Sequence, residues 1–322
     1  MRLVYYGTPA LAVPPLLRLV DDGRAPLLVV TRPDRPRGRG LRTGASPVKE
    51  AALARDLPVE TPARAGSPDA LERLRALAPD LLVVAAYGQI LPPALLAIPR
   101  LGAINVHYSL LPRHRGASPV QAALLAGDAE TGVTTMWITE GLDEGPTFLA
   151  RRTPIAPAED AGALGARLAA LGADLLAETL DRIERGEIVR DAQDPSRATY
   201  APKLEAADAR IPIADPPERI VRRVRALAPE PGAYLTLESG RLLVLEAVPG
   251  RAAAGDGSAA PPEPGTVLDV SREGGIEIAL PAGAIRLLRV KPEGRRAMAG
   301  SDYANGARLR PGARLPLAAA AP

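Results

Sequence analysis

Short apolar runs alternate with amphipathic stretches along the first half of the chain. The apolar runs end at turn residues and predict buried strands at residues 3–6, 27–31, 81–85 and 103–107. The stretches between and after them have helical spacing and predict helices at residues 10–20, 47–55, 69–76 and 120–125. Strands and helices in this order indicate an α/β domain whose mostly parallel sheet has helices on both faces.

The second half of the chain has a different pattern. A long helix is expected at residues 160–185, and a polar segment without clear periodicity follows it at residues 190–208. One further helix, at 217–227, precedes short segments of strand-like composition at residues 233–237, 242–248, 266–270, 276–280 and 285–290. Five short strands close together predict a small antiparallel barrel. We therefore expect an N-terminal domain over residues 1–189, a linker over 190–208 and a C-terminal barrel over 209–322.

Composition narrows the class of protein. The chain of 322 residues is 47% hydrophobic and 24% charged, which is typical of a soluble globular protein. It contains no cysteine and two histidines, so we expect neither a disulfide scaffold nor a metal site. No apolar run reaches the roughly 18 residues of a membrane-spanning helix. These features predict a cytoplasmic protein without a membrane segment, and we expect it to be a monomer.

The basic residues are unevenly distributed although the net charge is only +3. Three of the 40 basic residues are lysine and the rest are arginine, which the base composition of a GC-rich genome can explain. The arginines nevertheless form local clusters at residues 32–42, 219–225 and 286–314. Clustered arginine without interleaved aromatic residues favours contact with a phosphate backbone over base stacking.

Three polar residues could form a catalytic group. Asn105 and His107 are two positions apart on a predicted strand, so both side chains leave the same face near its carboxyl end. Asp143 lies in a turn between glycines after the apolar run 134–138. If the three meet, the Asn amide can donate to an oxyanion, the His can move a proton and the Asp can orient the His. Alternatively, Asn105 and His107 satisfy each other in the core and Asp143 is an ordinary turn residue.

The residues around this group resemble a known superfamily. Residues 105–117 (NVHYSLLPRHRGA) and 141–145 (GLDEG) resemble the catalytic segments of the 10-formyltetrahydrofolate-dependent formyltransferases. The resemblance extends from residue 1 to about residue 315. It implies a Rossmann-like N-terminal domain and a C-terminal barrel similar to the OB-fold. It also implies catalytic roles for Asn105, His107 and Asp143, with 10-formyltetrahydrofolate as the formyl donor and no metal.

The same resemblance implies two segments that bind folate. One comprises Ser109, Leu110, Leu111 and Pro112, and the other comprises Tyr87, Gly88, Gln89, Ile90 and Leu91. Tyr108 departs from the pattern, because the superfamily usually has a small residue at this position. We expect Tyr108 to alter the rim of the folate pocket.

Further segments resemble the branch of the superfamily that formylates methionyl initiator tRNA. These segments are residues 31–49, 199–204 and 291–298. The resemblance implies that initiator methionyl-tRNA is the partner and that Arg39 takes part in its recognition. Because arginines cluster in the same loop, we also expect Arg35, Arg37 and Arg42 to bind the tRNA. The loop that carries these arginines has almost no apolar residue, so we expect it to be exposed and mobile.

Three alternatives remain at this point. The acceptor could be a small amine, such as an amino-sugar nucleotide or glycinamide ribonucleotide, but the basic loop and the barrel would then have no role. The protein could be a formyltetrahydrofolate hydrolase, although the usual N-terminal regulatory domain of those enzymes is not expected here. It could also bind RNA without catalysis, against which the complete group of Asn105, His107 and Asp143 argues.

Overall fold

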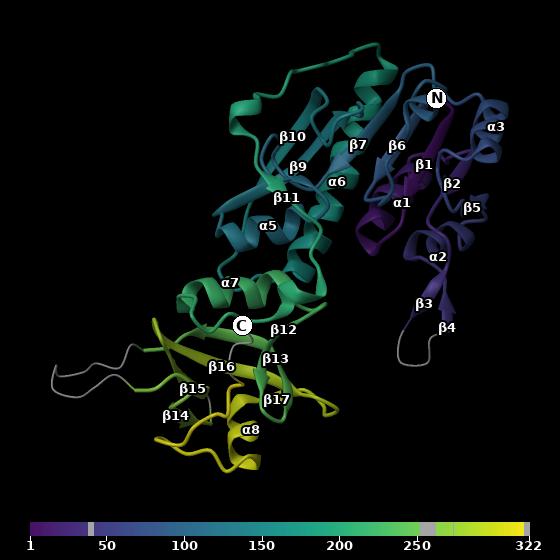
Figure 1. Ribbon diagram of the computed structural model, residues 1–322. Coiled ribbons are helices and arrows are strands. Elements are labelled where there is room, and N and C mark those ends of the chain that lie inside the picture. The colour runs from purple at the N-terminus through teal and green to yellow at the C-terminus, as the bar shows by residue number, and fades with distance from the viewer. Residues whose placement is uncertain (38–41, 252–261, 273, 319–322) are drawn as a thin grey trace. The chain divides into compact units, whose positions relative to one another are not determined.

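The computed structural model describes residues 1–37, 42–251, 262–272 and 274–318 (Figure 1). The chain forms two compact units. The N-terminal domain comprises Met1–Ala123, Ala129–Ile155 and Leu164–Lys203, and the C-terminal domain comprises Leu124–Asp128, Ala156–Ala163 and Leu204–Pro322. Most of the segment expected to be a linker therefore belongs to the N-terminal domain.

A seven-stranded sheet forms the centre of the N-terminal domain, in the order β10-β9-β7-β6-β1-β2-β5. Its parallel strands are β1 (Leu3–Gly7), β2 (Leu28–Val30), β5 (Val59–Glu60), β6 (Leu81–Ala85) and β7 (Ala103–His107). β9 (Glu130–Trp137) and β10 (Thr147–Pro154) are antiparallel to their neighbours. The four strands predicted from apolar runs are confirmed. The sequence did not predict β5, which is only two residues long, or β9 and β10, which carry several polar residues.

Helices cover both faces of this sheet. They are the 3₁₀ helix η1 (Ala10–Ala12), α1 (Val13–Asp21), α2 (Pro47–Leu53), α3 (Pro68–Leu77), α4 (Pro93–Leu96), α5 (Pro119–Ala126) and α6 (Ala161–Glu184). Leu74 of α3 and Leu95 of α4 share a core with Val4 and Tyr6 of β1. Tyr5 points to the opposite face, where its hydroxyl donates to the carbonyl oxygen of Ala12 at 2.5 Å. Successive side chains of a strand alternate in this way between two helical layers.

The first turn of α2 shows why the helix begins where the sequence predicts. Ser46 is in the extended conformation, and its hydroxyl oxygen accepts the backbone N–H of Lys49 at 3.0 Å. Pro47 follows at the first helical position. A backbone N–H at this position would have no intrahelical acceptor, so proline can stand there without the loss of a hydrogen bond. Ser67 and Pro68 begin α3 in the same way.

The C-terminal domain is an antiparallel sheet that closes on itself. It contains β12 (Ala233–Leu237), β13 (Gly240–Pro249), β14 (Val267–Ser271), β15 (Gly275–Leu280), β16 (Gly283–Pro292), β17 (Met298–Ala299), α7 (Pro217–Leu227) and α8 (Gly300–Gly306). The order β12-β13-β16-β15-β14 leaves β12 and β14 at the edges. Both edges bond to residues 313–318, through Ala318 N to Thr236 O (2.9 Å) and Val267 N to Ala313 O (2.8 Å). This segment completes the ring that the sequence predicts as a barrel.

The arginines of α7 bond within their own domain. Arg222 donates to the carbonyl oxygen of Ala126 (3.4 Å), Arg223 to that of Asp208 (2.6 Å) and Arg225 to that of Glu159 (2.9 Å). Carbonyl groups near turns and helix ends lack intrahelical donors, and guanidinium groups satisfy them. The cluster at residues 219–225, which the sequence suggested for phosphate contact, therefore ties α7 to its surroundings.

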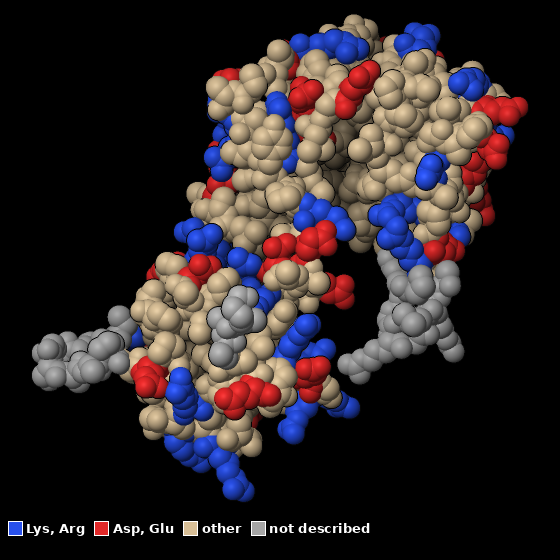
Figure 2. Space-filling model, viewed as in Figure 1, with Lys and Arg blue, Asp and Glu red and all other residues tan. Residues whose placement is uncertain are grey.

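Other arginines of the C-terminal domain are exposed. Arg295 and Arg296 follow β16, and Arg308 and Arg310 follow α8; all four are accessible to solvent. Figure 2 shows Lys and Arg side chains gathered around these two parts of the domain. This surface has positive charge available for an anionic partner, whereas Arg222, Arg223 and Arg225 of α7 are only partly exposed and bond to carbonyl oxygens.

Candidate active site

The structure brings Asn105, His107 and Asp143 together at the carboxyl end of β7. Asn105 and His107 leave the same face of that strand, and Asp143 lies in the turn between β9 and β10. Asp143 Oδ1 accepts a hydrogen bond from Asn105 Nδ2 at 3.5 Å, and its Oδ2 lies 3.6 Å from His107 Nδ1. An amide donor, an imidazole and a carboxylate thus share one site at the sheet edge where α/β proteins bind ligands.

The hydrogen bonds of His107 determine which ring nitrogen can exchange a proton. The side chain is only 5% exposed, and its Nε2 lies 2.9 Å from the carbonyl oxygen of His114. A carbonyl oxygen can only accept, so Nε2 carries a hydrogen. Nδ1 is therefore the nitrogen that gains and loses a proton, and it faces the carboxylate of Asp143.

Backbone geometry fixes the direction of the Asp143 carboxylate. Asp143 has φ +49°, a left-handed conformation that non-glycine residues adopt only when their surroundings hold them there. The N–H of Gly116 donates to Asp143 Oδ2 at 2.8 Å. Gly116 itself has φ +119°, and a Cβ at this position would lie 2.6 Å from the carbonyl oxygen of Ala201. Only glycine fits there, and its N–H anchors the carboxylate.

The predicted folate segment 109–112 is held by a residue that the sequence did not indicate. Ser109 is buried, and its hydroxyl donates to the carbonyl oxygen of Arg113 at 2.6 Å. The Thr134 hydroxyl donates to Ser109 O at 2.7 Å and accepts from Leu111 N at 3.2 Å. Thr134 on β9 thereby sets the path of the loop. Of the predicted residues, Leu110, Leu111 and Pro112 are the partly accessible ones.

The second predicted folate segment, residues 87–91, is only partly accessible. Tyr87 is buried with its ring edge-on against Tyr6, and burial raises its pKa to about 12, so that the phenol stays neutral. Leu91 is buried as well, whereas Gly88 and Ile90 are exposed. Gln89 accepts from Ala65 N at 2.9 Å and donates to Ala63 O at 3.3 Å. Gly88, Gln89 and Ile90 form the accessible part of this segment.

Tyr108 lies in the core, so the expectation that it alters the rim of a pocket was wrong. Its side chain is 3% exposed, and its hydroxyl donates to the carbonyl oxygen of Leu11 at 2.8 Å. Tyr108 follows His107 directly, so its side chain leaves the opposite face. There it packs against Gly172 of α6, where the absence of a side chain leaves room for the ring.

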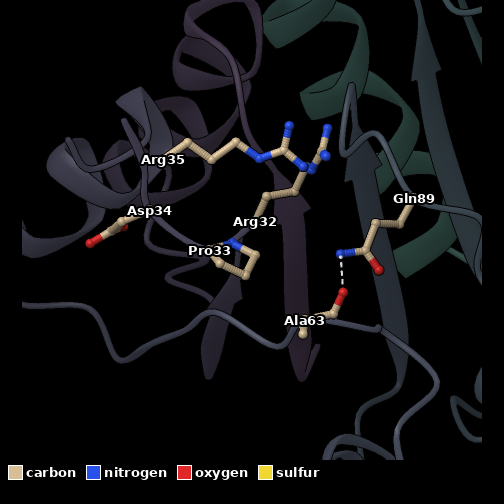
Figure 3. Close-up of a pocket in the computed structure, with 6 residues that line it drawn as sticks. All are labelled: Arg32, Pro33, Asp34, Arg35, Ala63 and Gln89. Atoms are coloured by element: carbon tan, nitrogen blue, oxygen red, sulfur yellow. Dashed lines mark hydrogen bonds between the residues drawn. The ribbon is translucent and has the colours of Figure 1, made fainter. Parts of the chain in front are cut away.

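A pocket of about 480 Å³ lies beside these segments and is shown in Figure 3. It is lined by Arg32, Pro33, Asp34, Arg35, Ala63 and Gln89. In Figure 3 the side chains of Arg32 and Arg35 extend in a different direction from that of Asp34. Asp34 is engaged elsewhere, because its Oδ2 accepts from Lys49 Nζ at 2.7 Å. Arg32 and Arg35 therefore give the pocket positive charge, while the carboxylate of the lining residue Asp34 is paired with Lys49.

The predicted tRNA-binding loop begins and ends as a two-stranded ribbon. β3 (Arg35–Arg37) pairs antiparallel with β4 (Arg42–Gly44), so the expected loop is partly regular. Backbone hydrogen bonds make this pairing, and it needs no apolar side chains. Arg35 is exposed. Arg39 lies outside the described residues, as do the side chains of Arg37 and Arg42.

The segment expected to be a linker is bound to the N-terminal domain along part of its length. The indole N–H of Trp137 donates to Val189 O at 2.8 Å, and Thr147 N donates to Asp191 O at 2.8 Å. Further on, β11 (Tyr200–Ala201) pairs with β8 (Arg115–Gly116). Residues 189–201 thus reach from the antiparallel strands of the sheet to the backbone that holds Asp143.

Comparison with known families matches both domains. Residues 16–180 match the model of the formyl transferase family, and residues 203–308 match that of the formyl transferase C-terminal domain. With the polar group at the end of β7, these matches define the class as a formyl transferase that has both domains. Methionyl-tRNA formyltransferase of Halorhodospira halophila is 50% identical over 313 residues, which are 97% of this chain and 98% of that protein. The chain belongs to the methionyl-tRNA formyltransferase family.

Solved structures share the fold at much lower identity. The N-formyltransferase of Helicobacter canadensis, in complex with folinic acid and dTDP-3-aminofucose, is 17% identical with a TM-score of 0.65, over 89% of this chain and 98% of that one. HypX of Aquifex aeolicus with tetrahydrofolic acid is 17% identical with a TM-score of 0.60, over 94% of this chain. This chain spans about half (47%) of HypX. Among the helices of the described residues, none is long and apolar enough to cross a membrane.

Proposed function

We propose that this protein transfers the formyl group of 10-formyltetrahydrofolate to the amino group of methionine esterified to initiator tRNA. The products are N-formylmethionyl-tRNA and tetrahydrofolate. The observation that carries the proposal is that Asn105 and His107, at the end of β7, both lie within 3.6 Å of the Asp143 carboxylate. The family to which the chain belongs supports both substrates.

In the proposed mechanism, the amine nitrogen attacks the formyl carbon directly. Asn105 Nδ2 and protonated Nδ1 of His107 stabilise the oxyanion of the tetrahedral intermediate. When the bond between the formyl carbon and N10 breaks, N10 gains a proton and the amine loses one. Asp143 orients the imidazole and relays the proton through water. Neither a metal nor a covalent enzyme intermediate takes part.

The distribution of charge supports tRNA as the acceptor. Arg35 at the start of the basic ribbon and the arginines after β16 and α8 are exposed, and a polyanion is their natural partner. A small amine would leave both surfaces without a role. That the protein acts in the cytoplasm as a monomer stays a prediction.

A transfer assay tests the proposed function. We expect formyl transfer from 10-formyltetrahydrofolate to methionyl initiator tRNA, and none to the same tRNA without methionine, because the α-amine is the nucleophile. The His107→Ala variant serves as the inactive control. Transfer to an amino-sugar nucleotide or to glycinamide ribonucleotide, without transfer to the charged tRNA, would contradict the assignment of tRNA as the acceptor.

Replacing Arg35, Arg37 and Arg39 together is expected to weaken binding of initiator tRNA and to reduce its dependence on salt. Each lost phosphate contact should reduce the slope of log affinity against log salt by somewhat under one unit, roughly 0.7 to 0.9. Folate affinity should not change, because the predicted folate segments lie on other loops. Filter binding at several salt concentrations measures the slope.

A triple variant of Arg55, Arg73 and Arg100 provides the matched control. It removes the same charge from the same domain, but each of these arginines is paired with an acid, namely Asp21, Glu60 or Asp80. The control should bind initiator tRNA with nearly the slope of the wild type. Equal losses in the two triple variants would show that only total charge matters and would remove the specific role of the ribbon.

A further inference from the structure

We propose that Gln193 is a positioning residue for Asp143 and that its side-chain amide holds the catalytic turn in its active geometry. Gln193 lies in the segment that the sequence suggested as a linker, 50 residues after Asp143. The inference rests on the proposed function, because it assigns a role within the same site.

The side chain of Gln193 uses all of its hydrogen-bonding capacity at this site. Its Nε2 donates to the carbonyl oxygens of Asp143 (2.8 Å) and Gly145 (2.7 Å). Its Oε1 accepts from Nη2 (2.8 Å) and Nε (3.1 Å) of Arg115. A guanidinium can only donate and a carbonyl can only accept, so the orientation of the amide is fixed by chemistry.

These bonds hold the backbone of a turn whose tip is exposed, while Gly116 and Asn105 bind the side chain of Asp143. Leu142 is 60% exposed and Glu144 is exposed, so apolar packing does not anchor that part of the turn. Asp143 has a left-handed conformation, which is uncommon for a residue with a side chain. Gln193 donates to the carbonyl oxygens on either side of Glu144. It thereby clamps the turn in the conformation that places Asp143 in the left-handed region.

Strand β8 connects the clamp to the carboxylate itself. Gly116 N–H binds Asp143 Oδ2 directly, while the neighbouring Arg115 binds Asp143 through Gln193. Arg115 is only 4% exposed, and this burial keeps its guanidinium in place. The backbone and the side chain of Asp143 are therefore held by adjacent residues of one short strand. Displacing the turn would move the carboxylate away from His107 Nδ1.

The Gln193→Glu substitution tests this role with little change in size. Glutamate keeps an oxygen for Arg115 but places its other oxygen against two carbonyl oxygens, so the clamp becomes repulsive. We expect kcat for formyl transfer to fall about 10- to 100-fold, as displacements near 1 Å can cause. The KM values for folate and tRNA should change little, because Gln193 is assigned no contact with either substrate.

Asp194→Ala provides the control from the same segment. The Asp194 carboxylate binds the backbone and hydroxyl of Ser196, so the substitution perturbs the segment without touching the turn of Asp143. Its kcat should stay within about twofold of the wild type. An equal loss in Asp194→Ala and Gln193→Glu would show that any disturbance of the segment lowers the rate, and it would overturn the specific role of Gln193.

A double-mutant cycle with Asp143→Ala separates positioning from general stability. If Gln193 acts through the carboxylate, adding Gln193→Glu to Asp143→Ala causes no further loss of kcat. Losses that multiply would overturn the proposal. So would Gln193→Glu and Gln193→Ala variants that unfold more easily but retain the wild-type kcat in their folded fraction.

The cycle uses the amine that the wild-type protein formylates. A wild type that is inactive on methionyl-tRNA but active on another amine would contradict the proposed acceptor, and the cycle would still test Gln193 with that amine. If the wild type formylates methionyl-tRNA and the Gln193 variants have the same kcat, the role of Gln193 is contradicted but the proposed function is not.

Discussion

Replacing His107 with alanine is expected to lower kcat for formyl transfer by about 10²- to 10⁴-fold, the usual range for loss of an acid–base group. His107 provides the one imidazole nitrogen, Nδ1, that faces Asp143 and is free to exchange a proton. Asn105→Ala and Asp143→Ala should lower kcat by about 10²-fold or more, because each removes one polar group of the same site. Single-turnover transfer from the folate to charged initiator tRNA measures the chemical step.

A His107→Gln variant shows whether the loss is chemical or structural. The glutamine amide nitrogen can occupy the place of Nε2 and still donate to the carbonyl oxygen of His114, but it provides no titrating group. We expect a rate close to that of His107→Ala and a melting temperature closer to that of the wild type. Recovery of turnover in His107→Gln, or a fall in melting temperature that accounts for the lost rate, would assign His107 a structural role.

Gly116→Ala should damage both stability and catalysis. The new Cβ would collide with the carbonyl oxygen of Ala201 at 2.6 Å, and alanine is strained at φ +119°. We expect a loss of about 2–4 kcal/mol in the free energy of unfolding, measured by urea denaturation. Turnover of the folded fraction should fall as well, because relief of the collision moves the N–H that binds Asp143 Oδ2.

Gly23→Ala is the matched control for this substitution. Gly23 also has positive φ, at +74°, but no atom lies within 4 Å of the position that its Cβ would occupy. It should lose about 1 kcal/mol from backbone strain alone and retain full turnover. Similar effects of the two substitutions would mean that the contact between Gly116 and Ala201 is unimportant.

The sequence predicted the parallel strands β1, β2, β6 and β7, but not the two-residue β5, because each of those four lies in a largely apolar run, the typical pattern of a strand buried on both faces. It did not predict β9, where Thr131, Thr134 and Thr135 are buried and the hydroxyl groups of Thr134 and Thr135 make hydrogen bonds. Threonine favours strands, but its polar hydroxyl interrupts the apolar run by which the other buried strands were predicted. In β9, hydrogen bonds to residues that are distant in the sequence allow the threonine side chains to be buried.

The candidate site also contains residues that the sequence indicated and residues that it did not. Spacing along one strand was enough to pair Asn105 with His107, and flanking glycines marked the turn of Asp143. Gln193 could not be found, because its segment has no periodicity and its partners are backbone carbonyls, which every residue has. Clustering likewise did not show that Arg223 and Arg225 bond to carbonyl oxygens whereas Arg35 is exposed.

The closure of the C-terminal barrel has a consequence for how the protein is made. A ribosome delivers the chain from its N-terminus, so β12 and β14 are translated well before residues 313–318, which join them. Until then β14 and the end of β12 near Thr236 lack these partners, although Ile211 N can already bond to Tyr234 O of β12, and unpaired strand edges promote association between chains. The N-terminal domain can fold while translation continues, but the barrel can close only after residue 318 has left the exit tunnel. A stop codon before residue 313 should therefore yield chains whose N-terminal domain is native and whose open barrel aggregates.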